Sequence, residues 1–246
     1  MKPPSSFALT AAALLIAGPA AGQAVFSEFE PNPIGADPAN STFELAGTAG
    51  ASFNYWIVSL ENDGYDGRVE RAANVTGTFD ANGLAVVTTP DLENPTFTVI
   101  LTDTFTGSIG DDLDAANDGT LDLSSLGTIF DAIAVSDIAG DNATLYGALL
   151  GGTDVLYNGS FEPLTIFRDA SLGEVFQTIT VNFDTPDEAT AVFNAAAVEV
   201  DPALFSADPT GTSYGVINPT LVPEPASLAL IGLGGITLAG RRRRNG

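Results

Sequence analysis

The chain has 246 residues, with 31 acidic and 8 basic side chains and neither cysteine nor histidine. Without cysteine there are no disulfide bonds and no thiolate chemistry, so an exported domain must be held together by burying apolar side chains. Without histidine the chain lacks the usual acid-base group at neutral pH, and a Ser-His-Asp triad is excluded. Carboxylates and hydroxyls remain for chemistry, so a carboxylate pair for hydrolysis stays open.

Residues 1–24 have the three regions of a secretory signal peptide. Lys2 precedes an apolar stretch over residues 7–17, and small residues lead to Ala24, after which we expect cleavage. The apolar stretch is shorter than the roughly 20 residues of a membrane-spanning helix. We therefore take residues 25–221 as the mature domain, which is long enough for one large all-β core.

This domain is more acidic than the chain as a whole. Arg68, Arg71 and Arg168 are its only cations, and against thirty acidic residues they leave a net charge of −27. Such a surface repels phosphate groups, so nucleic acid and anionic membrane surfaces are poor partners, and we expect no nucleic-acid binding. Adaptation to a saline environment and a role in binding cations both fit this charge.

Short β-prone runs separated by turn residues fill the domain. They are rich in Val, Ile, Thr, Phe and Tyr and are bounded by Gly, Asn, Asp or Pro. The expected strands are residues 25–30, 41–45, 54–60, 84–88, 97–101, 129–135, 165–168 and 175–181. Many short strands without long helical patterns predict an all-β antiparallel sandwich or barrel.

One helix is expected near the end of the domain. Thr185 is a suitable N-cap, Pro186 suits the first helical position, and Glu188 completes a capping box before residues 189–197. The alternative is that this segment continues as a strand through residues 198–200.

Several runs are similar to a known β domain. The domain opens with Phe-Ser-Glu-Phe-Glu-Pro-Asn-Pro at residues 26–33, and Phe-Glu-Leu follows at 43–45. Further runs lie at 56–64, 130–135 and 215–218, the last reading Gly-Val-Ile-Asn. Together they resemble a bacterial lamin-tail domain, although Ser41-Thr42 and Tyr214 depart from that pattern. The resemblance implies an immunoglobulin-like antiparallel β-sandwich that serves as an accessory or adhesive module, with no catalytic residues.

The densest cluster of oxygen ligands lies at residues 111–122, where five Asp and one Asn surround Gly119. An EF-hand starting at Asp114 would place Ala116 and Ser125 where carboxylates are required, so an EF-hand is not expected. A looser Ca²⁺ site is one interpretation of the cluster, and a solvated turn is the other. The residues of the candidate site are Asp112, Asp114, Asn117, Asp118 and Asp122.

Two adjacent aromatic residues, Tyr55 and Trp56, raise the possibility of sugar binding. Aromatic rings can stack on a sugar ring, and the domain would then be a carbohydrate-binding module, with or without Ca²⁺. The alternative is that both rings belong to the core of a strand with Ile57 and Val58.

The tail at residues 222–246 reads as a membrane-routing signal. Val222, Pro223, Glu224 and Pro225 precede a 15-residue apolar run at 226–240, and the stop signal Arg241, Arg242, Arg243 and Arg244 follows. As a helix, the run would span about 22 Å against a bilayer core of roughly 30 Å, and it contains four helix-weakening glycines. The arginines would stay on the cytoplasmic side. A transient membrane hold fits these features, and a permanent tail anchor is the alternative.

This tail resembles the PEP-CTERM sorting domain of bacterial exported proteins, which is also labelled an ice-binding protein C-terminal domain. The resemblance implies an exosortase as processing enzyme and contact with the inner membrane only before processing. We therefore expect a non-enzymatic structural or adhesive protein at the cell surface or in the extracellular matrix, with extracellular polysaccharide as a candidate partner. A carbohydrate-binding module is the first alternative, and a carboxylate-dependent hydrolase is the second.

Overall fold

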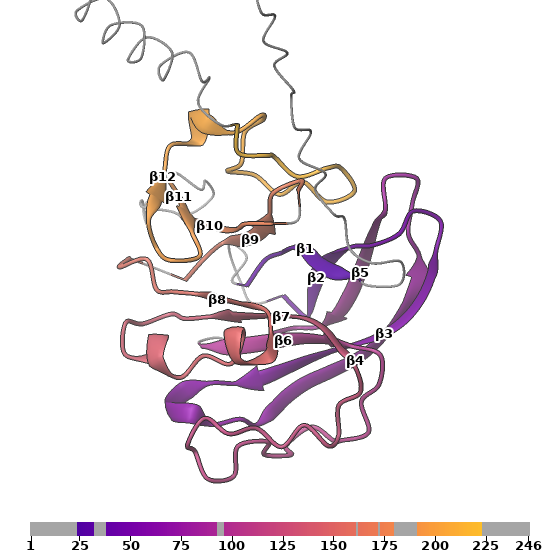
Figure 1. The fold of residues 1–246 in the computed structure, drawn as a ribbon, viewed down its shortest axis with the longest axis vertical. Helices are drawn as coiled ribbons and strands as arrows, with labels where there is room; N and C mark the ends of the chain where they lie inside the picture. The colour runs from indigo at the N-terminus through magenta and orange to yellow at the C-terminus, as the bar shows by residue number, and fades with distance from the viewer. Residues whose placement is uncertain are drawn as a thin grey trace, which may run out of the picture.

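The protein is described from a computed structural model, which places residues 24–31, 38–92, 96–160, 162–171, 173–179 and 191–222. Strands account for 43% of the structure and helix for 7%, so the all-β class predicted from the sequence is confirmed. The strands form two sheets, as expected for a β-sandwich (Figure 1).

Seven strands form the first sheet, in the spatial order β12-β11-β10-β9-β1-β2-β5. All neighbouring strands in this sheet are antiparallel. Their bounds are β1 Val25–Phe29, β2 Asn40–Ala46, β5 Leu84–Pro90, β9 Thr165–Arg168, β10 Val175–Ile179, β11 Ala191–Asn194 and β12 Glu199–Val200.

Five strands form the second sheet, in the order β4-β3-β6-β7-β8, with β8 parallel to β7 and the other pairs antiparallel. Their bounds are β3 Ser52–Glu61, β4 Val69–Thr78, β6 Phe97–Thr102, β7 Ile129–Val135 and β8 Thr153–Val155. β4 and β5 follow one another in the chain and lie in different sheets, so the free edges of the two sheets are neighbours on one side of the sandwich.

Short 3₁₀ helices lie in the connections of the described residues: η1 Asp63–Tyr65, η2 Asp141–Ala143, η3 Ala148–Leu150 and η4 Pro202–Leu204. None of the helices in these ranges is long and apolar enough to span a membrane.

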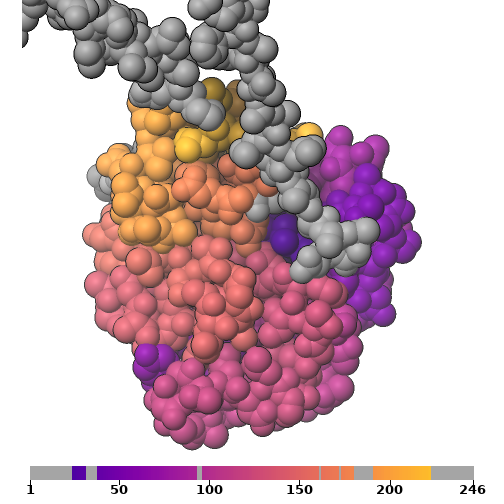
Figure 2. Space-filling model, viewed as in Figure 1, coloured from indigo at the N-terminus to yellow at the C-terminus, as the bar shows by residue number. Residues whose placement is uncertain are grey.

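The buried apolar side chains of the described residues form three clusters rather than one. The largest cluster lies between the sheets and includes Phe26, Phe43 and Phe97. A second cluster, around Ile100 and Tyr146, is covered in part by the long β6–β7 connection, which forms the lower end of the molecule in Figures 1 and 2. The third cluster is described with the C-terminal segment below. The second and third clusters cover the outer faces of the two sheets. This is why β6 and β10, which also face the cluster between the sheets, are buried at every position.

A buried ion pair joins the two sheets. Arg168 of β9 places one terminal nitrogen 2.7 and 2.8 Å from the two carboxylate oxygens of Asp131 on β7. Arg168 Nε also donates to the Phe26 carbonyl at 3.0 Å, and the Phe26 N–H donates to Asp131 at 2.9 Å. The ion pair therefore fixes β1, β7 and β9 relative to one another.

All eight strands expected from the sequence are present, with bounds that differ by a few residues at most, although residues 180 and 181 of the last lie outside the described ranges. Four strands were not among those expected: β4, β8, β11 and β12, of which β12 falls in the segment 198–200 that was considered as an alternative strand. The expectation of a helix over 189–197 is wrong from residue 191 onward, where β11 pairs with both β10 and β12. Pairing within the sheet has overridden the local helical preference there. The predicted capping box at Thr185–Glu188 lies outside the described residues.

The folded part begins no later than Ala24. This side chain is fully buried in the cluster between the sheets. Ala24 thus packs as part of the domain, whereas the expected signal peptide placed it on the other side of the cleavage point. The cleavage position itself stays a prediction, since residues 1–23 are outside the described ranges.

Candidate functional site

The last described segment, residues 205–222, lies against the seven-stranded sheet, and we call it the C-terminal strap. Its first residue, Phe205, packs against Phe167 and Phe176, with ring centroids 5.9 and 5.0 Å apart, and forms the third apolar cluster. Phe205 also forms a β-bridge with Leu221, and the N–H of Val222 donates to the Leu204 carbonyl at 2.7 Å. Both ends of the strap are therefore held on the domain.

The middle of the strap binds two buried glutamates. Glu28 of β1 and Glu44 of β2 are directly opposite one another in the sheet, and both are buried. The Ser213 N–H lies 2.9 and 3.1 Å from the two Glu28 carboxylate oxygens, and Ser213 Oγ lies 2.7 Å from Oε2. The Gly215 N–H donates to Glu44 Oε2 at 2.7 Å. Backbone and side-chain groups of the strap therefore recognise both carboxyl groups.

A β-bulge in β1 makes this arrangement possible. The register shifts between Phe26 and Glu28, so Ser27 is an extra residue in the pairing with β2. Phe26 and Phe29 both enter the core between the sheets, while Ser27 and Glu28 both contact partners of the strap. A bulge re-aims side chains in this way, and here it turns two consecutive polar residues toward the strap.

Asn218 completes the contact. Its Nδ2 lies 2.9 Å from the carbonyls of Ser27 and Arg168 and 3.1 Å from Ser27 Oγ. Ser27 Oγ in turn donates to Glu44 Oε1 at 2.8 Å. A cavity of about 120 Å³ is bordered by Ser27, Asn218 and Asp169, so a small space adjoins this polar network.

Burial changes the protonation of these groups. Burial raises the pKa of Glu28 to about 7, although the hydrogen bonds from Ser213 oppose the rise, and the negative charges of Glu44 and Glu30 add to it. Burial likewise raises the pKa of Glu44, against the hydrogen bonds from Gly215 and Ser27. The strap therefore covers two carboxyl groups that titrate closer to neutral pH than free glutamate does.

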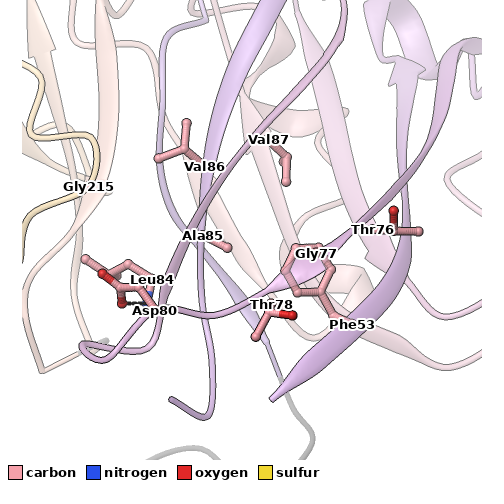
Figure 3. Close-up of a pocket in the computed structure, with 10 residues that line it drawn as sticks. All are labelled: Phe53, Thr76, Gly77, Thr78, Asp80, Leu84, Ala85, Val86, Val87 and Gly215. Carbon is pink, nitrogen blue, oxygen red and sulfur yellow. Dashed lines mark hydrogen bonds between the residues drawn. The ribbon is translucent and has the colours of Figure 1, made fainter. Parts of the chain in front are cut away.

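A groove of about 290 Å³ lies on the side of the sandwich where the free edges of β4 and β5 meet. Figure 3 shows Phe53, Thr76 and Thr78 on one wall and residues 84–87 on the other. Asp80 lies at the end of the groove and accepts the N–H of Leu84 at 2.8 Å. The groove thus offers hydroxyl and carboxylate groups beside apolar walls, which is the composition of many small-ligand sites.

The structure does not bring the predicted Ca²⁺ ligands together around a common point. Asp114 is fully buried and accepts hydrogen bonds from Tyr146 Oη at 2.8 Å, from the Gly119 N–H at 2.7 Å and from the Asp118 N–H at 3.1 Å. Burial acts to raise the pKa of Asp114, but these hydrogen bonds outweigh it and the pKa is lowered. The buried Asp114 carboxylate thus holds the loop in its conformation through these hydrogen bonds.

The other predicted ligands lie on the loop surface. Asp112, Asp118 and Asp122 each accept a hydrogen bond from the backbone N–H two residues further along, at 2.9 to 3.0 Å. Asn117 is exposed and has a left-handed backbone with φ of 51°. These are the contacts of tight Asx turns, which a loop forms without an ion. Calcium binding by the loop stays a prediction.

A different acidic group has the closer geometry. Oxygens of Asp63, Asp137 and Asp141 lie within 4.8 Å of one another beside η1 and η2. Burial and the charges of Asp141 and Asp137 raise the pKa of Asp63. The buried Thr96 hydroxyl contacts Asp137 at 2.6 Å and Asp141 at 3.0 Å. This group was not predicted, because its members are up to 78 residues apart in the chain and only the fold brings them together.

The aromatic pair considered for sugar binding belongs to the packing of the domain. Tyr55 stacks on Phe53 at 5.4 Å within the cluster between the sheets. Trp56 packs edge-on against Phe105 at 5.8 Å beside the second cluster. The alternative interpretation of these residues as core aromatics therefore agrees with their contacts.

The predicted sorting residues Pro223, Glu224 and Pro225 and the arginines at 241–244 lie outside the described residues, as does the apolar run. Val222 is the last residue described, and it is half exposed at the end of the strap. The described part of the chain therefore ends at the surface of the sandwich.

Comparison with protein families identifies residues 221–244 as a PEP-CTERM protein-sorting motif. This confirms the sorting signal expected from the sequence, and it indicates exosortase-dependent sorting to the cell envelope, with export to the cell surface or extracellular space. Comparison with curated proteins and with solved structures gives no match.

Proposed function

We propose that this chain is a non-enzymatic exported protein whose β-sandwich has a structural or adhesive role in the cell envelope or extracellular matrix. The observation that carries the proposal is the junction at residue 221. The sorting motif begins there, and Leu221 and Val222 still pair with Phe205 and Leu204 of the folded domain. The sandwich is therefore the cargo of the sorting signal, with no linker or further module between the two.

The positions of the lamin-tail-like residues support this assignment of the domain. Glu28 and Glu44 come from the first two runs of the resemblance, and Gly215 and Asn218 from the last. These residues lie in one hydrogen-bonded network although they are up to 190 positions apart in the chain. A sequence pattern whose members meet in space fits a common structural origin, and we propose a lamin-tail-like sandwich on this basis.

Two features favour a non-enzymatic role over a carboxylate-dependent hydrolase. Hydrolysis by carboxylates requires two such groups at one accessible site. The groove between β4 and β5 has only Asp80 in its walls, and the cavity beside Ser27 has only Asp169. The paired Glu28 and Glu44 are covered by the strap, where a substrate has no access. Asp63, Asp137 and Asp141 do form an accessible group of carboxylates, but they line neither the groove nor the cavity.

The proposal is tested in a bacterial host that contains an exosortase. The mature protein should lack the segment from 226 onward, as measured by mass spectrometry of its C-terminus. Replacing Pro223, Glu224 and Pro225 with alanine should leave an unprocessed form in the membrane fraction. Pro219→Ala, in the strap but outside the motif, is the matched control and should be processed normally. An intact tail on the mature wild-type protein would contradict the proposal and favour a permanent anchor.

A second candidate function is carbohydrate binding, which the groove between β4 and β5 favours. Thr76, Thr78 and Asp80 supply hydroxyl and carboxylate groups of the kind that bind sugar hydroxyls. Binding on a glycan array should be lost in the double variant Thr76→Val/Thr78→Val and kept in Thr88→Val, a neighbour outside the groove. Loss of binding on chelation, restored by Ca²⁺ in the wild type but not in Asp112→Asn/Asp118→Asn, would assign a role to the acidic loop.

A further inference from the structure

The contact between the strap and β1 has one hydrogen atom too few if Glu28 is ionised. Ser213 Oγ lies 2.7 Å from Glu28 Oε2 and 2.5 Å from Asn218 Oδ1. A serine hydroxyl has one hydrogen and can donate to only one of them. Both distances are those of hydrogen bonds rather than of two oxygens without a proton between them. One of the neighbours must therefore be a donor.

Asn218 cannot be that donor. Its Nδ2 faces the backbone carbonyls of Ser27 and Arg168, both at 2.9 Å, and these groups can only accept. The amide orientation is therefore fixed by its partners, and the atom that faces Ser213 is the oxygen. The missing hydrogen must then lie on Glu28.

We propose that Glu28 is a neutral carboxylic acid in the folded protein, that it donates to Ser213 Oγ, and that this proton latches the C-terminal strap onto the sheet. Ser213 Oγ donates its own hydrogen to Asn218 Oδ1, and Asn218 Nδ2 donates to backbone carbonyls of β1 and β9. The latch is a chain of hydrogen bonds in one direction, whose members strengthen one another. The inference concerns the fold of the exported domain and does not depend on the sorting or adhesive role.

The charges around Glu28 agree with a neutral acid. Glu44 lies directly opposite on β2, and Glu30 directly follows the end of β1, so two like charges act on Glu28. Like charges opposite one another destabilise a sheet. Glu44 has two donors, Ser27 Oγ and the Gly215 N–H, which suits an ionised carboxylate. One acid of the pair is therefore expected to be neutral and the other ionised.

No cation of the described residues balances the pair. Arg168 lies on β9, the strand next to β1, but its guanidinium binds Asp131 and the Phe26 carbonyl. Arg68 pairs with Asp66, and Arg71 binds groups of residues 70 and 91. The remaining titratable groups that act on the two glutamates are Tyr214 of the strap, which contacts Glu30 at 3.4 Å, and Asp80, whose charge acts on Glu44. These neighbours are acidic or neutral, so none favours ionisation of Glu28.

The latch makes opening of the strap depend on pH. With the strap closed, burial holds the pKa of Glu28 at about 7, and with the strap open the side chain returns to its ordinary value of 4.5. At a pH between these two pKa values, opening of the strap therefore releases the proton of Glu28. Opening becomes more favourable as pH rises through this range. The opening equilibrium should increase roughly 40-fold between about pH 5 and pH 7, and it should level off at higher pH.

Two measurements on the purified mature protein test the proposal. Carbon NMR of the glutamate side-chain carboxyls should show one group that titrates near neutral pH and is missing in Glu28→Gln. Hydrogen exchange of the strap amides, corrected for the intrinsic effect of pH, should lose protection by that factor between about pH 5 and pH 7. Glutamine keeps a donor toward Ser213 and carries no charge, so protection in Glu28→Gln should keep only the smaller pH dependence that comes from Glu44, whose pKa burial also raises. Glu199→Gln, which removes an exposed carboxylate on β12, is the matched control and should behave as the wild type.

Three outcomes would overturn the proposal. A Glu28 carboxyl that titrates at or below the ordinary value overturns the proposal, and so does wild-type strap protection that is independent of pH. A pH dependence of the full wild-type size in Glu28→Gln shows that another group controls the strap, and it also overturns the proposal. The wild-type measurements decide the question by themselves if the variant fails to fold.

Discussion

Removing the cation of the buried ion pair between the sheets should strongly destabilise the protein. In Arg168→Met, Asp131 would lose contacts of 2.7 and 2.8 Å to the guanidinium, in a position where both side chains are less than one-tenth exposed. Breaking a buried pair from one side costs about 3–5 kcal/mol of unfolding free energy, because the remaining charge is desolvated without compensation. Asp131 keeps the N–H groups of Phe26 and Ala132, which favours the lower end of this range. Such a loss is a large share of the 5–15 kcal/mol that is typical of a folded domain.

The assay is urea unfolding at neutral pH, followed by the fluorescence of Trp56, the single tryptophan. With a slope of about 2 kcal/mol per molar urea, the midpoint should fall by roughly 2 M. Arg68→Met is the matched control, because Arg68 forms an exposed pair with Asp66 at 3.6 Å and should cost at most about 1 kcal/mol. Adding Asp131→Asn to Arg168→Met should recover part of the loss. Equal and small effects of Arg168→Met and Arg68→Met would refute the reasoning, since the inter-sheet pair would then contribute no more than a surface pair.

Three further predictions follow from individual contacts. Tyr146→Phe removes a donor from the buried Asp114 and should lower the unfolding free energy by about 1–3 kcal/mol in the same urea assay, and an unchanged midpoint would contradict it. Asp63→Asn should stabilise the protein by about 1 kcal/mol at low salt by relieving repulsion from Asp137 and Asp141, and a gain that persists in molar salt would exclude this electrostatic cause. Because folding raises the pKa of Glu28 from 4.5 to about 7, its contribution to stability is complete below the unfolded value and is lost as pH rises to about 7. Urea midpoints should therefore fall over that range in the wild type and fall less in Glu28→Gln, in which Glu44 and Asp63 still have raised pKa values.

The sequence predicted the strands well where each run had both β-prone residues and clear turn boundaries. β7 and β9 have the predicted bounds, and β6 is buried at every position because both of its faces are covered. β4 was missed, since residues 70–74 read Glu-Arg-Ala-Ala-Asn and have low β-propensity. It is nevertheless a ten-residue strand, because its whole length pairs with β3. Local composition cannot report a strand that exists through its partner.

The candidate sites were harder to predict for a related reason. The composition of residues 111–122 suits Ca²⁺, but composition does not say where a carboxylate points. Asp114 turns inward because Tyr146, 32 residues later, meets it inside the domain. The latch is more distant still, since Glu28 and Ser213 are separated by 185 residues. The only sequence signal for it was the lamin-tail-like pattern, which contained Glu28, Glu44, Gly215 and Asn218 but gave no reason for their association.

The strap explains how a removable tail can follow directly on a folded domain. Most of its binding contacts come from Phe205, Ser213, Gly215 and Asn218, which precede the sorting motif at 221–244, while Leu221 and Val222 are the first two residues of the motif. A cut beyond Pro225 would therefore leave all of these residues in place, and the sandwich would keep its cover over Glu28 and Glu44 after processing. Conversely, the described domain ends at Val222, directly before Pro223–Pro225 in the sequence, so the strap is the part of the domain that lies closest in sequence to the processing site. A latch that loosens as pH rises would free the segment next to the cleavage motif without unfolding the core between the sheets, because the strap packs on the third cluster and not on the first.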